Sequence, residues 1–179
     1  MKNFVKLLLL VVVMVGISVS ASAQTFKFGH INSQELIMLM PESDSAQVKL
    51  EAFGKELQEQ IEDMQTEWQE KLTIYEQKQA TWTAAVLEVK QKELQDFSRR
   101  IQEFQQTAQQ EFQKKQQELM IPIMDKAKST IETVAKRENF IYVFDISAGP
   151  LAYFNEQQST DLLPLVKKEL NITKELPRR

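Results

Sequence analysis

The sequence contains no cysteine and only one histidine, His30. Disulfides, thiolate metal sites and cysteine nucleophiles are therefore excluded. A catalytic histidine needs a nucleophile and an orienting acid beside it, and the residues around His30 supply neither, so we interpret it as a structural strand residue. The four glycines form no phosphate-binding loop, and no metal-ligand spacing is present. We therefore expect a protein that is not an enzyme and needs no cofactor.

Neither an excess of positive charge nor a long apolar run is present. The formal net charge is −3 at pH 7, which gives no support to nucleic-acid binding. The apolar run 7–15 is shorter than the roughly 20 residues that span a bilayer. Two lysines precede this run and Ala21-Ser22-Ala23 follows it, a pattern that favours a cleaved signal peptide over an uncleaved anchor helix. We predict a signal peptide over 1–23, cleavage before Gln24, and a mature chain outside the cytoplasm.

Glycine and proline are nearly absent between Asp44 and Arg137, where Gly54 and Pro122 are the only examples. Gln, Glu and Lys, which are good helix formers, dominate this stretch. Its apolar residues recur every three or four positions and form a narrow seam, as in coiled-coil helices. The seam residues are Leu50, Phe53, Leu57, Ile61, Met64, Trp68, Leu72, Tyr75, Leu87, Leu94, Phe97, Ile101, Phe104, Ala108 and Phe112.

The phase of this seven-residue repeat changes near Trp82. A stutter in one straight coiled coil could absorb the change. A hairpin over 44–122 with its turn near 80–85 explains it better, because one fold-back point places five apolar pairs opposite each other. Each arm of roughly 37 residues would reach about 55 Å. The predicted pairs are Ile61 with Phe104, Met64 with Ile101, Trp68 with Phe97, Leu57 with Ala108, and Phe53 with Phe112.

The segments 24–43 and 123–179 flank the hairpin and are predicted to form a small β-rich body. Pro122 should kink the returning helix at the junction with this body, and the tail to Arg179 should be frayed. The predicted elements are a strand (Phe26–Ile31), a helix (Ser33–Met40), a helix start capped by Asp44, a strand covered on both faces (Phe140–Ile146), a returning strand (Leu151–Phe154) and a helix (Leu162–Leu170) capped by Asp161.

This body is too small to bury a stable core alone, since a fold below roughly 40 residues usually needs metals, disulfides or oligomerisation. The residue composition leaves oligomerisation, and sheet edges shared between subunits would complete the body. The expected interface residues are Phe26, Phe28, Ile141, Val143, Phe144 and Tyr153.

The closing part of the chain is its most specific segment. Ser129–Ala135 leads through Phe140–Asp145 to Leu151–Phe154 and Asp161-Leu162. Together with the signal peptide, the first strand and the Gln/Lys/Glu-rich hairpin, this order resembles the Skp/OmpH family of periplasmic chaperones, over the whole mature chain. The resemblance implies an α+β fold, with a long antiparallel coiled-coil hairpin, or tentacle, on a small β-rich trimerisation body.

The resemblance also implies a function. A homotrimer would enclose a cavity with three tentacles and act in the periplasm as an ATP-independent holdase. It would bind unfolded outer-membrane β-barrel proteins and prevent their aggregation before membrane insertion. Family members are often strongly basic, whereas residues 67–100 carry six basic and six acidic side chains. We therefore transfer no lipopolysaccharide site and expect Arg99-Arg100 to be solvated helix surface.

Five aromatic residues of the hairpin are candidates for client contact, although packing in the seam is their default role. Trp82 differs because it would lie at the tentacle tip, where contact with a client or with a membrane surface is as well supported as packing. The candidates are Trp68, Tyr75, Trp82, Phe97 and Phe104.

Two classes of function fit these features. A holdase predicts arms that splay at weak points such as Gly54, whereas a structural spacer or adaptor of the cell envelope or a secretion system predicts a tight, rigid rod. Gly54 and the charged interruptions at Lys71 and Lys90 favour the holdase.

Overall fold

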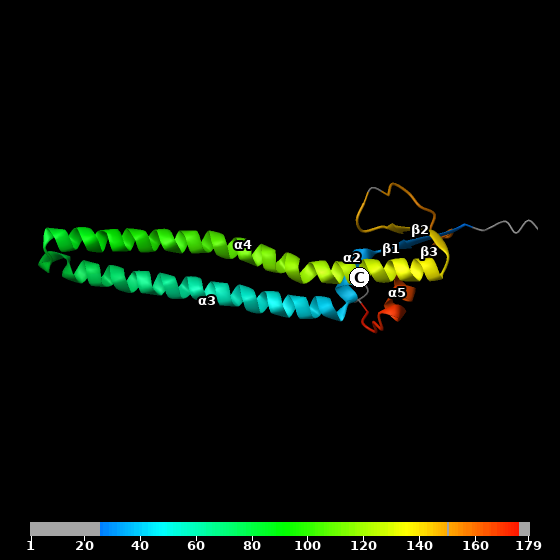
Figure 1. The fold of residues 1–179 in the computed structure, drawn as a ribbon, viewed down its shortest axis with the longest axis horizontal. Coiled ribbons are helices and arrows are strands. Elements are labelled where there is room, and N and C mark those ends of the chain that lie inside the picture. Colours follow the sequence, from blue (N-terminus) through cyan, green and yellow to red (C-terminus); the bar gives the residue numbers. More distant parts are fainter. Residues whose placement is uncertain (1–25, 150, 176–179) are drawn as a thin grey trace, which may run out of the picture.

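The computed structural model describes residues 26–149 and 151–175. The predicted signal peptide and its cleavage site lie outside these residues. Two long antiparallel helices, α3 (Pro41–Lys78) and α4 (Ala84–Arg137), project from a small body at one end of the molecule (Figure 1). This arrangement confirms the predicted fold class, a helical hairpin on a small β-containing body. None of the helices in the described part is long and apolar enough to cross a membrane.

The first arm begins earlier than predicted. Met40 is extended, and Pro41 occupies the first turn of α3, where its missing N–H costs no hydrogen bond. Asp44 is therefore not the cap of this helix but lies inside its first turn. Its carboxylate instead accepts hydrogen bonds from Lys174, so the tail is held at this residue, whereas residues 176–179 of the tail lie outside the described structure.

The chain reverses through a short 3-10 helix, η1 (Gln79–Thr81), and the second arm starts after Thr83. The Thr83 hydroxyl caps α4 by accepting a hydrogen bond from the Val86 amide at 3.4 Å. The helix continues through Pro122 as far as Arg137, so this proline does not interrupt it. Figure 1 shows a shallow bend in α4 as it approaches the body.

The sheet is entirely parallel, with β1 (Lys27–Ile31) between β2 (Phe140–Asp145) and β3 (Ser159–Asp161). The predicted returning strand at Leu151–Phe154 is wrong. Parallel strands need a crossover of about a dozen residues, and the chain between β2 and β3 serves as that crossover. Phe154 instead packs its ring on His30, with centroids 4.8 Å apart.

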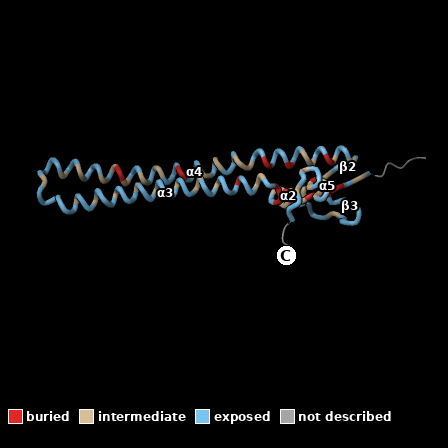
Figure 2. The backbone as a smooth tube through the Cα atoms, turned by 90° about the horizontal axis from the view of Figure 1, so that it is seen from below, coloured by how far each residue is buried: buried red, intermediate tan, exposed pale blue. Residues whose placement is uncertain are grey.

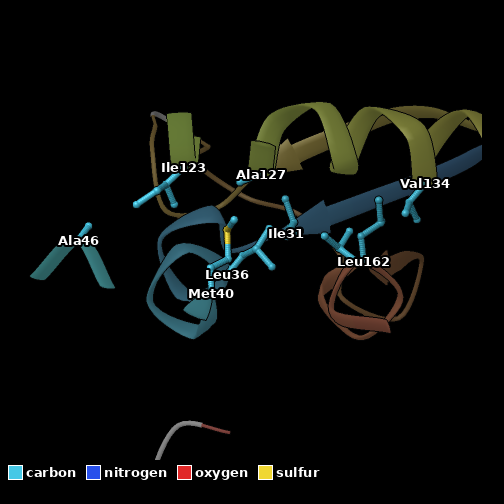
Figure 3. Close-up of a cluster of buried hydrophobic side chains, with 9 residues drawn as sticks. Ile31, Leu36, Met40, Ala46, Ile123, Ala127, Val134 and Leu162 are labelled. Atoms are coloured by element: carbon cyan, nitrogen blue, oxygen red, sulfur yellow. The ribbon is translucent and has the colours of Figure 1, made fainter. Parts of the chain in front are cut away.

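The core lies where the sheet, α4 and two short helices, α2 (Ser33–Leu39) and α5 (Leu163–Glu169), meet (Figure 3). Asn32 caps α2, and the Asp161 carboxylate accepts a hydrogen bond from the Leu163 amide at the start of α5. Figure 2 shows that buried positions concentrate in this body and are sparse along the arms. The buried cluster comprises Ile31, Leu36, Met40, Ala46, Ile123, Ala127, Val134, Leu162 and Val166.

The expectation that β2 is covered on both faces is not met within one chain. Ile141 is 46% exposed, Tyr142 60% and Phe144 42%. β2 is an edge strand, and in the described structure it pairs only with β1. β2 therefore carries apolar side chains on both faces and yet lies at the surface of the single chain.

Candidate functional site: apolar surfaces of the body and arm

An aromatic row crosses the exposed face of the sheet. The Phe28 and Tyr142 rings stack with centroids 6.3 Å apart, and Tyr142 and Phe144 stack at 6.1 Å. The outer backbone edge of β2 lies beside this row. A flat apolar edge strand is a template for pairing with another chain. The body therefore presents both an apolar face and a hydrogen-bonding edge.

The residues predicted for the subunit interface are distributed unevenly over this surface. Phe26 is 65% exposed and Tyr153 80% exposed, and Phe28, Ile141 and Phe144 are each at least 40% exposed. Val143 differs, because it is half-buried and packs against the core of its own chain. Five of the six are thus available to a partner, and Val143 stabilises the fold.

An apolar groove of about 580 Å³ runs between α4 and β2. Its apolar walls include Ile37, Met124, Ile131 and Ile141. Met124 is 52% exposed. The groove continues the apolar surface of β2 onto the helix, which enlarges the area that a partner or client can cover.

In the middle of the arm, the predicted client residues bind the two helices together. The Trp68 indole Nε1–H donates a hydrogen bond to the Leu94 carbonyl oxygen at 3.2 Å. Phe97 is only 5% exposed, and the Arg100 guanidinium lies 4.7 Å from its ring centroid. Phe104 is half-buried in the same seam. The closed hairpin therefore does not present Phe97 to a client.

The tip has its own small cluster. Tyr75 and Trp82 pack edge to face, with ring centroids 5.9 Å apart, and both are half-buried. Ile74 beside them is 47% exposed, and Val86 and Val89 are 39% and 56% exposed. Ile74 and Val86 were not among the residues predicted for client contact. Both are apolar residues outside the predicted seam, and this position in the sequence could have indicated that they are exposed.

In the part of the arms away from the body, the ion pairs of the described structure join residues three or four apart on one helix, such as Lys71 with Glu67 at 3.2 Å and Arg99 with Asp96 at 2.6 Å. Pairs of this exposed kind contribute little to stability. No cluster of metal-ligating side chains occurs among the described residues. The exposed apolar side chains, rather than a concentration of one charge, thus distinguish the arm surface.

Two polar clusters serve the fold of the body. His30 Nδ1 lies 2.8 Å from the Ser159 hydroxyl, which joins β1 to β3 and agrees with a structural role for this histidine. Burial alone would raise the pKa of Asp145, but hydrogen bonds from Ser147 and Ser33 outweigh it and hold that pKa below its usual range. Asp145 thereby links the end of β2 to the start of α2.

The long two-helix arm on a small sheet has counterparts among known proteins. The family described as "Outer membrane protein (OmpH-like)" matches residues 27–170, and the chain belongs to this family. A solved structure of a candidate outer membrane chaperone (OmpH-like) from Caulobacter crescentus shares the fold. It has a TM-score of 0.69 at 15% identity, covering 86% of this chain and 89% of that one. No curated protein sequence matches.

Proposed function

We propose that this protein is a non-enzymatic holdase that binds unfolded outer-membrane β-barrel proteins in the periplasm and prevents their aggregation before membrane insertion. The observation that carries the proposal is the long arm with exposed apolar side chains at its tip, joined to a body with an exposed aromatic face. Membership of the OmpH-like family and the candidate chaperone of the same fold support it. Release without a nucleotide follows from differential affinity, because a folded client no longer exposes the surface that binds.

We propose further that the working form is a homotrimer assembled through the body. Phe28, Ile141 and Phe144 remain exposed in one chain, and the outer edge of β2 offers backbone donors and acceptors. A neighbouring copy that covers this surface would bury apolar area and complete the sheet. Three arms around one cavity would then combine weak contacts into useful affinity, because tethering raises their effective concentration.

We propose that clients contact the surface of the arm. Trp82 and Tyr75 supply aromatic area at the tip, and Ile74, Val86 and Val89 extend it. Trp68, Phe97 and Phe104 would contribute only when the two helices separate. The same tip surface, an indole flanked by aliphatic side chains, suits peripheral contact with a membrane interface.

The spacer alternative has one specific observation in its favour. Phe97 is buried and Trp68 hydrogen-bonds across the seam, so the middle of the hairpin is tight, as a rigid rod requires. A rod would not suppress the aggregation of unfolded proteins.

The deciding experiment combines light scattering, which gives the oligomer mass, with aggregation suppression of an unfolded β-barrel protein at low and high salt. We expect a trimer that suppresses aggregation with little salt dependence, because screening removes little net attraction between a client and a charge-balanced arm. A monomer that melts cooperatively would refute the assembly, and absence of suppression would leave the spacer as the better account.

A further inference from the structure

The root of α3 is joined to the rest of the chain by a short link. α2 ends at Leu39 and α3 starts at Pro41, so Met40 alone separates the two helices. Met40 is extended, with φ −71° and ψ 132°. Met40 anchors the start of α3, because its side chain is fully buried in the core. The direction that the 38-residue helix takes from there depends also on contacts made by its first turn.

The Ser43 hydroxyl donates a hydrogen bond to the Ile37 carbonyl of α2, and two acidic side chains of the same turn reach α4 and the segment after α5. Glu42 pairs with Lys126 of α4. Asp44 accepts two hydrogen bonds from the Lys174 ammonium, at 2.7 and 2.9 Å, and the same ammonium lies 3.4 Å from the Met38 carbonyl oxygen. Lys174 therefore bridges α2 and α3 on either side of the link.

The backbone conformation after α5 places Lys174 beside Met38 and Asp44. Asn171 has a positive φ of 54°, and the Ile172 amide donates to the Lys167 carbonyl at 2.9 Å. The Asn171 amide donates to the Lys168 carbonyl at 3.2 Å, which completes a Schellman turn at the helix end. Ile172 packs against the buried core. Figure 1 shows the tail in red beside α2 and the beginning of α3.

The apolar seam behind these ion pairs is thin at the root. Ala46 is the one buried residue of α3. An open groove of about 500 Å³ runs along the first turns of α3 and the facing part of α4, with Leu119, Pro122 and Ile123 among its walls. A shift of α3 against α4 at the root would therefore disrupt few interlocking large side chains of α3.

We propose that residues 171–175, which follow α5, are a strap that holds the root of the first arm closed through the Lys174–Asp44 ion pair, and that release of this strap lets α3 move away from α4. The strap itself is a property of the single chain, and only its role in admitting clients depends on the proposed holdase function. Since the pair is exposed, salt weakens it.

The absence of native cysteine makes a distance measurement direct. Spin labels at Val48 of α3 and Thr133 of α4 report the separation of arm root and body, with labelled chains diluted into unlabelled protein. We expect Lys174→Gln to raise the population with a longer distance about two- to fivefold, the factor typical of losing one exposed ion pair. High salt should have the same effect on the wild type.

Two further variants make the test specific. The exchanged pair Asp44→Lys with Lys174→Asp should restore the wild-type distances, because it rebuilds the ion pair with reversed polarity. Lys168→Gln is the matched control, since Lys168 is an exposed lysine of α5 for which the described structure shows no ion pair. Equal distributions in wild type, Lys174→Gln and Lys168→Gln would overturn the strap. Because no client takes part, failure of the holdase assay would leave this result intact.

Discussion

Substituting Gly29 of the central strand β1 by alanine should destabilise the body, because the side chains of Leu162 and Phe140 pack directly on this position. An ideal Cβ at Gly29 would lie 2.2 Å from the Leu162 Cδ1 and 3.1 Å from two atoms of the Phe140 ring. Favourable contacts between carbon atoms lie at about 3.5–4.0 Å, so Leu162 must move. Leu162 has no exposed surface and belongs to the core, so it has no open space to enter.

Overpacking of a filled core costs about 1–3 kcal/mol. In a chain of this size each kilocalorie lowers the melting temperature by about 2–4 °C, so we expect Gly29→Ala to melt about 2–12 °C lower. The assay is thermal unfolding followed by circular dichroism at one fixed protein concentration, because an oligomer's melting temperature depends on concentration. The arms dominate the helical circular dichroism signal. Hydrogen exchange of the β1 amides therefore measures the stability of the body separately from that of the arms.

Gly149→Ala is the matched control, because nothing lies within 4 Å of a Cβ at that position. Shortening the opposing side chain with Leu162→Val should recover part of the loss caused by Gly29→Ala, since the two residues are in contact and their effects should couple. A Gly29→Ala variant that melts with the control, or one that shows no coupling to Leu162→Val, would refute this account of the packing.

The remaining predictions concern assembly, register and pH. Phe144→Asp should dissociate the oligomer in light scattering, because an unpaired charge buried at an interface costs several kcal/mol; an unchanged mass would exclude this face from the interface. Cysteines at Ile61 and Phe104 should cross-link within one chain, since disulfides need Cα atoms within about 7 Å; absence of a cross-link would reject that register. The lowered pKa of Asp145 stabilises the folded state above the pKa of the unfolded chain, and this stabilisation is lost as pH falls through the folded pKa. Asp145→Asn should therefore be less stable than wild type at neutral pH, and the difference should vanish in acid denaturation; a constant difference would contradict the linkage.

The helical arms were predictable because their pattern is local. Residues three and four apart share a helix face whatever the rest of the chain does, so the apolar spacing indicates the seam directly. One contact lies close to the predicted register of the two arms. A Cβ on Gly54 would lie 3.0 Å from the Phe112 ring, and Gly54 follows Phe53, the residue predicted to lie opposite Phe112. Gly54 thus admits a neighbouring ring closely, a role that the sequence did not reveal.

The predictions from the sequence were wrong where contacts between distant segments determine the structure. Leu151–Phe154 has the composition of a strand, yet in the described structure it pairs neither with the outer edge of β2 nor with β1, whose two sides are taken by β2 and by Ser159–Asp161. Composition does not say which of two candidate segments wins a place in a sheet. The role of Asp44 was likewise set by Lys174, 130 residues later, and no local capping rule contains that partner.

The central position of β1 also sets the order in which the molecule can fold. Phe28 pairs with Tyr142 on one side and with Ser159 on the other, so the first strand of the described chain waits for its last segments. The hairpin can form early from contacts near its turn, such as that of Trp68 with Leu94, 26 residues later, whereas pairing between distant strands is slow. Until then β1 has two open edges, the condition in which strands associate wrongly. If the chain emerges from the membrane with its N-terminus first, it passes through the same exposed state from which it is proposed to protect its clients.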